Sequence, residues 1–498
     1  MTQTTGRQRR GFVLAAAALM GLVVLTYLPQ IGELPARGEE TRWATVAREM
    51  AASGDWIVPR QQGEPFFSRP PLGSWLIAIA ARLRGELDIA AVRLPTVFAV
   101  VAASLMVFWY AMKAMPASWA FVAGLAFAAC VQVLQLGRVG ETDVVFAALV
   151  AGSMFLWRGL WREGRPTTGS WLIGYALAAL AVLAKGPQGP AYFVAAAVAT
   201  LLVERKVRAL WTRGHAAGAA VFVVIMLAWY VPVLAAVGPA GVAAFWTGDV
   251  ALRWEQGSIG GWARHLVEFP VELWCCFLPW SVVLLALVKR DIRKVVFADP
   301  YVRFALIAVA AAFPTCWLTP NARVRYFLPL FPAMAVIAAA TLRETALHAR
   351  ERGSVFGPRR VVAEALACAV LIATADNGIR LPMLKAKGDD TEGKVAALRK
   401  RFDGEGLIPS IGPVHHRFAY FYRDPVPLIA EDDAGRVKEG SLFTVSTNRK
   451  RLFAPPFGYE VVARIPCDSA NHKDGPVDYV LVGRRLATIA EASTKEKR

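Results

Sequence analysis

Cysteine and histidine are scarce in this sequence, and their spacing excludes the common metal and disulfide frameworks. The 498 residues contain six of each, and no two cysteines show the Cys-x-x-Cys spacing of zinc or redox sites. Most of the cysteines lie in or beside apolar segments, where a free thiol behaves as a small hydrophobic side chain. We therefore interpret them as packing residues.

The first apolar run lacks the small-residue cleavage site of a secretory signal peptide. Arg7, Arg9 and Arg10 precede this run, Gly11–Leu28, and many further apolar runs follow it. This order predicts a signal anchor that stays in the membrane. The chain also shows no internal repeat and no long low-complexity segment.

Acidic residues are outnumbered by basic ones, 38 to 56, for a net charge of +18. The apolar fraction is 56%, above the roughly 45–50% of soluble domains, and the mean hydropathy is +0.41. Because the basic residues lie between apolar runs, we attribute the charge to membrane topology and exclude nucleic-acid binding. The composition predicts a polytopic membrane protein.

About eleven apolar segments before residue 376 approach the roughly 20 residues needed to cross a bilayer. Lys and Arg gather in alternate connections, such as 158–165 and 289–294, which predicts that these connections are cytoplasmic. The long connections Ile31–Ala90 and Gly238–Pro270 then face outward from a bacterial-type inner membrane. The segments are 11–30, 91–112, 117–136, 143–160, 171–184, 188–203, 216–237, 271–288, 302–318, 325–342 and 360–375.

The character of the chain changes after about residue 376, where short apolar runs alternate with turn residues and charges. The runs include Phe418–Tyr422, Leu442–Val445 and Tyr479–Val482, which indicate a small α/β domain with strands of ordinary length. The predicted fold is therefore an all-α transmembrane domain over 1–375, with a functional outer loop at 31–90, and an extracytoplasmic α/β domain over 376–498.

The outer loop contains two predicted helices joined by a proline-fixed segment. In Gly38–Ala52 the apolar residues recur at helical spacing, and Gly54 follows as a stop. A second helix over Leu72–Leu83 begins after Pro70-Pro71. We expect the first helix to lie in the membrane plane, with Trp43 at headgroup depth.

Glu39 and Glu40 form an acidic pair at the start of the first loop helix. Charge near the membrane is costly and therefore suggests function. The structural alternative is that the pair complements the positive end of the helix dipole.

A second charged cluster, Arg138, Glu141 and Asp143, lies at the outward ends of two predicted spans. Such residues are often only membrane anchors. Together with the acidic pair, however, they combine carboxylates suited to acid–base chemistry with cations suited to phosphate. The cations predicted on this side are Arg69, Lys185, Arg323 and Arg325.

Several motifs resemble the GT-C glycosyltransferases of the protein O-mannosyltransferase and aminoarabinose-transferase superfamily. The resemblance covers most of residues 30–335 and is specific in combination. It is carried by Glu39-Glu40, Arg42-Trp43, Arg48-Glu49-Met50, Ser53-Gly54-Asp55-Trp56, Arg69-Pro70-Pro71-Leu72, Trp75-Leu76, Ala184-Lys185-Gly186-Pro187, Trp229-Tyr230, Pro279-Trp280 and Arg325-Tyr326-Phe327-Leu328-Pro329.

The resemblance implies inverting transfer of a sugar from a polyprenyl-phosphate donor to a lipid, glycan or protein acceptor. Glu39, at a position that is usually Asp in the family, becomes the candidate base that activates the acceptor hydroxyl. Glu40 and Asp143 are the other candidate catalytic acids. The candidate ligands of the donor phosphate are Arg42, Arg69, Lys185 and Arg325.

Two departures from the family pattern bear on metal binding. Ser68 stands where the family often has Glu, and Arg69 replaces a Lys. Some relatives bind a divalent metal through that Glu and a later His. No cofactor is therefore assigned, but a divalent metal stays an open alternative for which His265 is the candidate ligand. Phe245–Asp249 and Arg253–Glu255 also resemble a later outer loop of the family, or else form an aromatic interfacial belt.

Two other functions are compatible with the sequence. A transporter or flippase of lipid-linked sugars would also carry intramembrane charges, but it should show a path from both faces. A membrane scaffold that binds a partner through its C-terminal domain would have no use for the paired acids.

Overall fold

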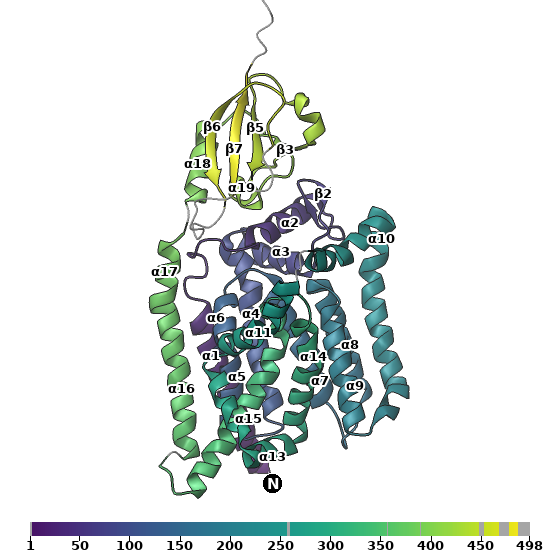
Figure 1. The fold of residues 1–498 in the computed structure, drawn as a ribbon, viewed down its shortest axis with the longest axis vertical. Coiled ribbons are helices and arrows are strands. Elements are labelled where there is room, and N and C mark those ends of the chain that lie inside the picture. The colour runs from purple at the N-terminus through teal and green to yellow at the C-terminus, as the bar shows by residue number, and fades with distance from the viewer. Residues whose placement is uncertain are drawn as a thin grey trace, which may run out of the picture. The chain divides into compact units, whose positions relative to one another are not determined.

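The computed structural model describes residues 2–255, 259–355, 357–388, 390–447, 453–467 and 478–486. Two compact units make up this described part (Figure 1). The helical unit comprises Met1–Gly32, Trp56–Val58 and Phe67–Leu381, and the mixed unit comprises Glu33–Asp55, Pro59–Phe66 and Pro382–Arg498. The last segment begins near the predicted boundary at residue 376, but the mixed unit also contains two pieces of the predicted outer loop.

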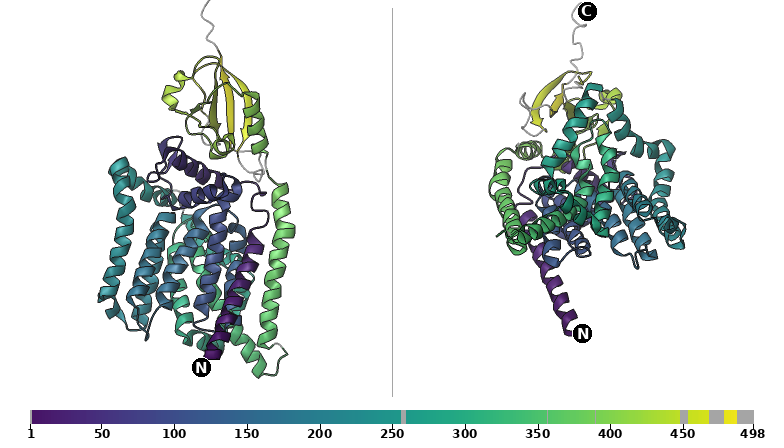
Figure 2. Two further views of the ribbon diagram at one scale, coloured as in Figure 1. Left: turned by 180° about the vertical axis from the view of Figure 1, so that it is seen from behind. Right: turned by 60° about the horizontal axis from the view of Figure 1, so that its bottom comes forward.

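The helical unit is a bundle in which α7 packs against α4, α8 and α9 (Figures 1 and 2). Tyr110 of α4 stacks on Phe155 of α7 with ring centroids 4.1 Å apart, and the fully buried Trp157 lies among other aromatic rings. The helices are α1 (Thr2–Tyr27), α3 (Leu72–Arg84), α4 (Ile89–Ala111), α5 (Ala117–Ala128), α6 (Val131–Leu136), α7 (Thr142–Gly159), α8 (Thr168–Lys185), α9 (Gln188–Val203), α10 (Arg213–Glu255), α11 (Ile259–Cys276), α12 (Trp280–Leu284), α13 (Arg290–Ala298), α14 (Pro300–Trp317), α15 (Phe331–Glu351) and α16 (Pro358–Ala375).

Side-chain caps fix the starts of α4, α8 and α14. Asp88 Oδ1 accepts a hydrogen bond from Ala91 N at 2.7 Å at the start of α4, and Asp299 Oδ1 accepts one from Tyr301 N at 2.8 Å at the start of α14. Such caps satisfy N–H groups that have no partner within the helix.

Among the described residues, seven helices are long and apolar enough to cross a membrane, or eight if the bent pair Gly260–Cys276 and Trp280–Val288 counts as one span. Three shorter apolar helices, Gly11–Tyr27, Ala117–Ala128 and Gln188–Val203, account for the remaining predicted segments. The predicted span 117–136 is wrong as one helix, because Cys130 adopts an extended conformation that separates α5 from α6. The polytopic membrane fold is confirmed.

The mixed unit is built on a five-stranded sheet in the order β4-β3-β5-β7-β6. Strand β3 pairs in parallel with β4 and β5, whereas β7 pairs antiparallel with β5 and β6. The strands are β3 (Ser410–Ile411), β4 (Leu428–Ile429), β5 (Leu442–Thr447), β6 (Tyr459–Pro466) and β7 (Tyr479–Arg485). A hairpin of β1 (Arg60–Gln61) and β2 (Glu64–Pro65) and the helices α2 (Glu40–Ser53), α18 (Thr391–Arg401) and α19 (His416–Tyr422) complete the unit. Helix α17 (Leu381–Ala386) begins at the last residue of the helical unit and continues into the mixed unit.

The strands alternate their side chains between two small cores, as a pleated sheet requires. Leu442 and Val480 belong to the core that includes α18 and α19, while Phe443 and Leu481 belong to the core of the other face. The run Phe418–Tyr422, interpreted from sequence as strand-like, is instead helical, and Phe418 stacks on Tyr422 one turn later.

The first loop helix is confirmed as α2, which ends at Gly54 in a left-handed conformation with φ of 75°. Its apolar face, including Val46 and Met50, is buried. Trp43 is buried as well and makes an edge contact with Phe66. The mixed unit therefore surrounds Trp43, and the orientation of the helix in the membrane plane stays a prediction. The second predicted loop helix is confirmed as α3.

Candidate functional site

The acidic pair at the start of α2 is divided between two environments. Glu40 is fully buried, and its Oε2 accepts a hydrogen bond from Arg37 N at 2.7 Å. The Glu39 side chain is 41% exposed and makes no capping hydrogen bond to α2. Glu40 therefore orders the chain that leads into α2, whereas Glu39 presents a carboxylate to solvent.

Arg42 holds the Glu39 carboxylate from one turn along the helix. The two side chains form an ion pair, and the Arg42 guanidinium lies 5.6 Å from the ring centroid of Phe66, which follows β2. An ion pair at this helical spacing is ordinarily weak, but the aromatic ring adds a second contact that restricts the arginine.

Helix α2 is attached to α19 by hydrogen bonds inside the mixed unit. Thr41 Oγ1 lies 2.6 Å from His416 Nδ1, and Arg48 Nη2 donates to Ala419 O at 2.6 Å. Burial lowers the pKa of His416 to about 2, with the nearby His415 as a second cause. His416 is therefore a neutral imidazole, and the Thr41 bond connects two uncharged groups.

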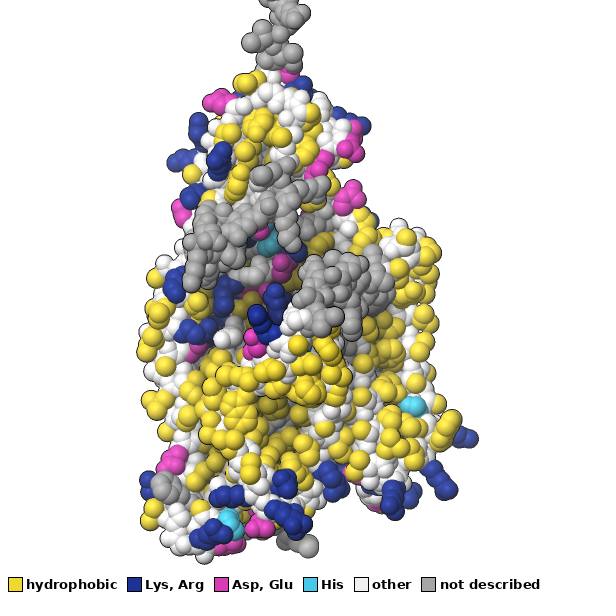
Figure 3. Space-filling view, viewed as in Figure 1, with side chains coloured by type: hydrophobic (Ala, Val, Ile, Leu, Met, Phe, Trp, Pro, Cys, Tyr) yellow, Lys and Arg dark blue, Asp and Glu magenta, His cyan; other side chains and the backbone are white. Residues whose placement is uncertain are grey.

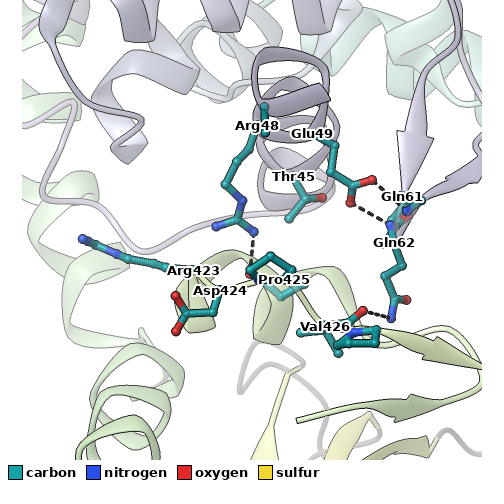
Figure 4. Close-up of a pocket in the computed structure, with 13 residues that line it drawn as sticks. Thr45, Arg48, Glu49, Gln61, Gln62, Arg423, Asp424, Pro425 and Val426 are labelled. Atoms are coloured by element: carbon teal, nitrogen blue, oxygen red, sulfur yellow. Dashed lines mark hydrogen bonds between the residues drawn. The ribbon is translucent and has the colours of Figure 1, made fainter. Parts of the chain in front are cut away.

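A pocket of about 490 Å³ in the mixed unit lies beside this attachment (Figure 4). Glu49 accepts hydrogen bonds from Gln62 N at 2.7 Å and from Gly63 N at 3.0 Å, so it joins α2 to the β1–β2 hairpin. Gln62 Nε2 in turn donates to Val426 O at 3.2 Å. The motif residues Arg48 and Glu49 thus fix the orientation of α2.

The helical unit contains four of the predicted catalytic and phosphate-binding residues, Arg69, Asp143, Lys185 and Arg325, and two of them pair at the ends of apolar helices. Asp143, in the first turn of α7, forms an ion pair with Lys185, the last residue of α8. Their side chains are only 6% and 9% exposed, respectively. Lys185 Nζ also lies 4.9 Å from the ring centroid of Tyr326. Charges buried this far are retained only when they are paired.

Arg325 and Glu141 form a second ion pair at the same end of α7, with Nη1 and Oε2 3.0 Å apart. Glu141 precedes α7 directly, and the Arg325 guanidinium lies 5.7 Å from the ring centroid of Tyr326. Tyr326 therefore contacts the cations of both pairs. Two cations and two carboxylates are brought together in this way.

Arg69 lies just before α3 and is half-buried. Its Nη1 donates to Ser68 O at 2.8 Å. At the start of α3, a Cβ on Gly73 would come within 2.6 Å of the Thr142 side chain, so α3 and α7 approach closely there and only glycine fits.

Arg138 does not join the cluster predicted for it. It pairs instead with Asp376 at 2.6 Å and donates to Asn377 Oδ1 at 2.9 Å, and Arg380 also contacts Asp376. The grouping of Arg138 with Glu141 and Asp143 was wrong because its true partner lies more than two hundred positions later. The sequence signal for this ion pair was Asp376, an acidic residue directly after the last apolar segment.

Tryptophans of the motifs secure the short piece of outer loop that belongs to the helical unit. Trp229 Nε1 donates to Ile57 O at 3.1 Å, and Trp75 Nε1 donates to Trp56 O at 2.8 Å. These indole bonds hold the chain that connects α2 to the hairpin. Trp75 and Trp229 belong to motifs named from the sequence, but the sequence did not predict what these side chains do.

His265, the candidate metal ligand, contacts a backbone carbonyl and an aromatic ring. Its Nε2 lies 3.2 Å from Cys316 O, and its ring is 5.2 Å from that of Phe269. Within the described ranges, no three His, Cys, Asp or Glu side chains are grouped so that they could hold a metal. The side chains of Phe245–Asp249 and Arg253–Glu255 lie outside the described part.

Sequence comparisons find relatives of this chain among known proteins. A family model described as dolichyl-phosphate-mannose-protein mannosyltransferase matches residues 68–233. An undecaprenyl phosphate-alpha-4-amino-4-deoxy-L-arabinose arabinosyl transferase of Sodalis glossinidius is 28% identical over 378 residues, which cover 73% of this chain and 65% of that protein. The chain spans between 28% and 65% of the length of the first curated relatives it matches.

Solved structures show the same fold. The structure of ArnT from Cupriavidus metallidurans in the apo state matches with a TM-score of 0.72 at 18% identity, covering 95% of this chain and 98% of that one. The structure of the same protein bound to undecaprenyl phosphate matches with a TM-score of 0.67, with the same identity and coverage.

Proposed function

We propose that the chain is a GT-C glycosyltransferase of the superfamily that includes the protein mannosyltransferases and the aminoarabinose transferases, and that it transfers a sugar from a polyprenyl-phosphate carrier to an acceptor hydroxyl. Nothing in the matches supports the alternative interpretation as a transporter.

The observation that carries the proposal is the buried Lys185–Asp143 pair beside the Arg325–Glu141 pair. Ionisable groups that a membrane protein buries among its apolar helices usually mark a functional site. A polyprenyl phosphate places its charge at headgroup depth, and its departing phosphate needs cations. Lys185 and Arg325 fit this role, and Arg69 is the third candidate. The bound undecaprenyl phosphate of the ArnT structure supports a donor of this class.

We assign Glu39 as the general base on the strength of its exposed carboxylate and the resemblance of its motif. The acceptor hydroxyl transfers its proton to Glu39 while the oxygen of that hydroxyl forms a bond to the anomeric carbon of the donor sugar. The bond from that carbon to the phosphate oxygen breaks, and the electron pair leaves with the polyprenyl phosphate. Attack opposite the leaving group inverts the anomeric centre.

The relatives and the distribution of basic residues support a more specific proposal for the donor, the acceptor and the side of the membrane. We propose an undecaprenyl-phosphate pentose or hexose as donor, with a lipid such as lipid A, a glycan or a protein as acceptor. Basic side chains line the lower end of the helical unit (Figure 3), and Arg158 lies at the end of α7 opposite Asp143. The excess of positive charge in cytoplasmic loops supports an active site on the extracytoplasmic side of the inner membrane.

The test is a transfer reaction with purified full-length protein in detergent, supplied with an undecaprenyl-phosphate sugar and an envelope-lipid extract. We expect release of undecaprenyl phosphate together with gain of one sugar on an acceptor. The proposal is wrong if normally folded protein neither binds nor consumes any donor of this class.

A further inference from the structure

A second polar pocket lies in the helical unit at the opposite end of α7 from Asp143. It has a volume of about 460 Å³ and is lined by residues at the ends of α7 and α9 and at the start of α14. Arg158 belongs to the last turn of α7, Glu204 follows α9, and Arg303 lies near the start of α14. We call it the Arg158 pocket. Its residues have no part in the proposed transfer reaction.

One buried carboxylate in the Arg158 pocket is surrounded by three cations. Glu204 Oε1 lies 2.7 Å from Arg158 Nη2, and its Oε2 lies 2.6 Å from Lys206 Nζ. The Arg303 guanidinium approaches the same carboxylate at 4.0 Å. The other acid of the lining, Glu163, is exposed. Positive charge therefore exceeds negative charge in the pocket.

Hydrogen-bond donors in the Arg158 pocket also outnumber acceptors. The buried Nε atoms of Arg158 and Arg303 and the indole Nε1 of Trp161 have no hydrogen-bond partner among the described residues, although the Arg158 side chain is only 5% exposed. Buried donors without acceptors are costly. An anion rich in acceptor oxygens would supply what this cluster lacks, most simply a phosphate.

Exposed apolar side chains flank the Arg158 pocket. Leu160, Leu202 and Val203 are exposed next to its lining residues, and Trp211 is 90% exposed. In Figure 3 the basic side chains gather at this end of the helical unit, below a surface that is mainly hydrophobic. Exposed tryptophan and basic residues beside an apolar surface mark headgroup depth in membrane proteins.

We propose that the Arg158 pocket binds the phosphate of an anionic phospholipid of phosphatidylglycerol type. Basic pockets between membrane helices recognise such headgroups. The exposed Leu202 and Val203 favour a lipid over free phosphate, because they offer the acyl chains a surface that a soluble anion would not use. Lipid bound here ties the ends of α7, α9 and α14 together.

The test is a lipid titration followed by native mass spectrometry, using full-length protein stripped of lipid in neutral detergent. Wild-type protein should retain phosphatidylglycerol in preference to phosphatidylcholine. The pocket variant Lys206→Gln/Arg303→Gln leaves the Arg158–Glu204 pair intact. It should bind phosphatidylglycerol roughly 30-fold more weakly, because each of the two juxtamembrane cations contributes about fivefold to the affinity. Lys206→Gln alone is the milder variant, and Lys206→Arg/Arg303→Lys should preserve binding.

The matched control is Arg208→Gln/Arg213→Gln, which removes the same charge from exposed positions nearby that do not line the pocket. The control should bind phosphatidylglycerol within about twofold of wild type, since diffuse surface charge is screened by salt. Equal losses in the pocket and control variants would overturn the proposal. So would equal retention of phosphatidylcholine, or full displacement of the lipid by an equal concentration of inorganic phosphate.

Discussion

The Lys185–Asp143 pair can be tested by separating its structural contribution from its chemical one. Lys185→Met leaves the Asp143 carboxylate buried without its cation, since both side chains are less than a tenth exposed. Breaking a buried pair from one side typically costs about 3–5 kcal/mol, so the single variant should lose much of its thermal stability. The double variant Lys185→Met/Asp143→Leu removes both charges, and apolar replacement of a whole pair is often neutral.

We therefore expect the double variant to melt close to wild type and yet fail to bind the donor. Thermal unfolding in detergent gives the stability, and titration with undecaprenyl phosphate gives the affinity. A variant of wild-type stability and weak donor binding separates the two roles. If the double variant is stable and binds the donor like wild type, the pair serves only to join α7 to α8, and the assignment of Lys185 to the donor phosphate is wrong.

Three further changes probe the other assigned residues. Glu39→Gln should reduce turnover by roughly 10²–10⁴-fold, as loss of a general base does, while donor binding persists. Glu40→Gln should instead lower the free energy of unfolding by about 1–3 kcal/mol. If the transfer and melting assays give the reverse pattern, Glu40 is the base and Glu39 is the structural residue. The pKa of His416 is near 2 in the folded protein and about 6.5 in the unfolded protein, so only the unfolded state gains this proton as the pH falls below about 6.5. The free energy of unfolding should therefore decline by about 2 kcal/mol between pH 7 and pH 5. Hydrogen exchange of the α2 peptides should show this decline in the wild-type protein but not in the His416→Asn variant. Arg69→Ala should weaken donor binding strongly, and Arg350→Ala should not weaken it. Arg69→Lys should weaken binding partly, because the ammonium group is a point charge and cannot bind phosphate in the bidentate geometry of a guanidinium group. Equal effects at Arg69 and Arg350 in a donor titration would show that Arg69 does not belong to the site.

Local patterns were enough to predict the elements of the outer loop. The apolar spacing of Trp43, Val46 and Met50 predicted α2, and Gly54 marked its end, because helical periodicity and glycine stops depend on nearby residues only. The same holds for α3 after its proline pair. The membrane-plane orientation of α2 stays a prediction, because periodicity shows that one face of a helix is buried without showing what buries it.

Long-range partners could not be predicted in the same way. The sequence presents Glu39 and Glu40 as one acidic pair, but the fold buries Glu40 and exposes Glu39. It also grouped Arg138 with its neighbours, whereas Asp376 is its partner. The attachment of Thr41 to His416 joins residues far apart in the chain. Such pairs depend on the topology of the whole fold, which single-sequence periodicity does not contain.

The measurement that tests the central claim most directly is mass spectrometry of envelope lipids, glycans and glycoproteins from cells with and without this gene. Cells carrying the wild-type gene should contain a glycoconjugate that is heavier by one sugar residue, and deletion should remove that mass. A plasmid with the wild-type gene should restore it, and one with Glu39→Gln should not, at equal protein level. Identical glycoconjugate profiles in all of these strains would contradict the assignment of this chain as a glycosyltransferase.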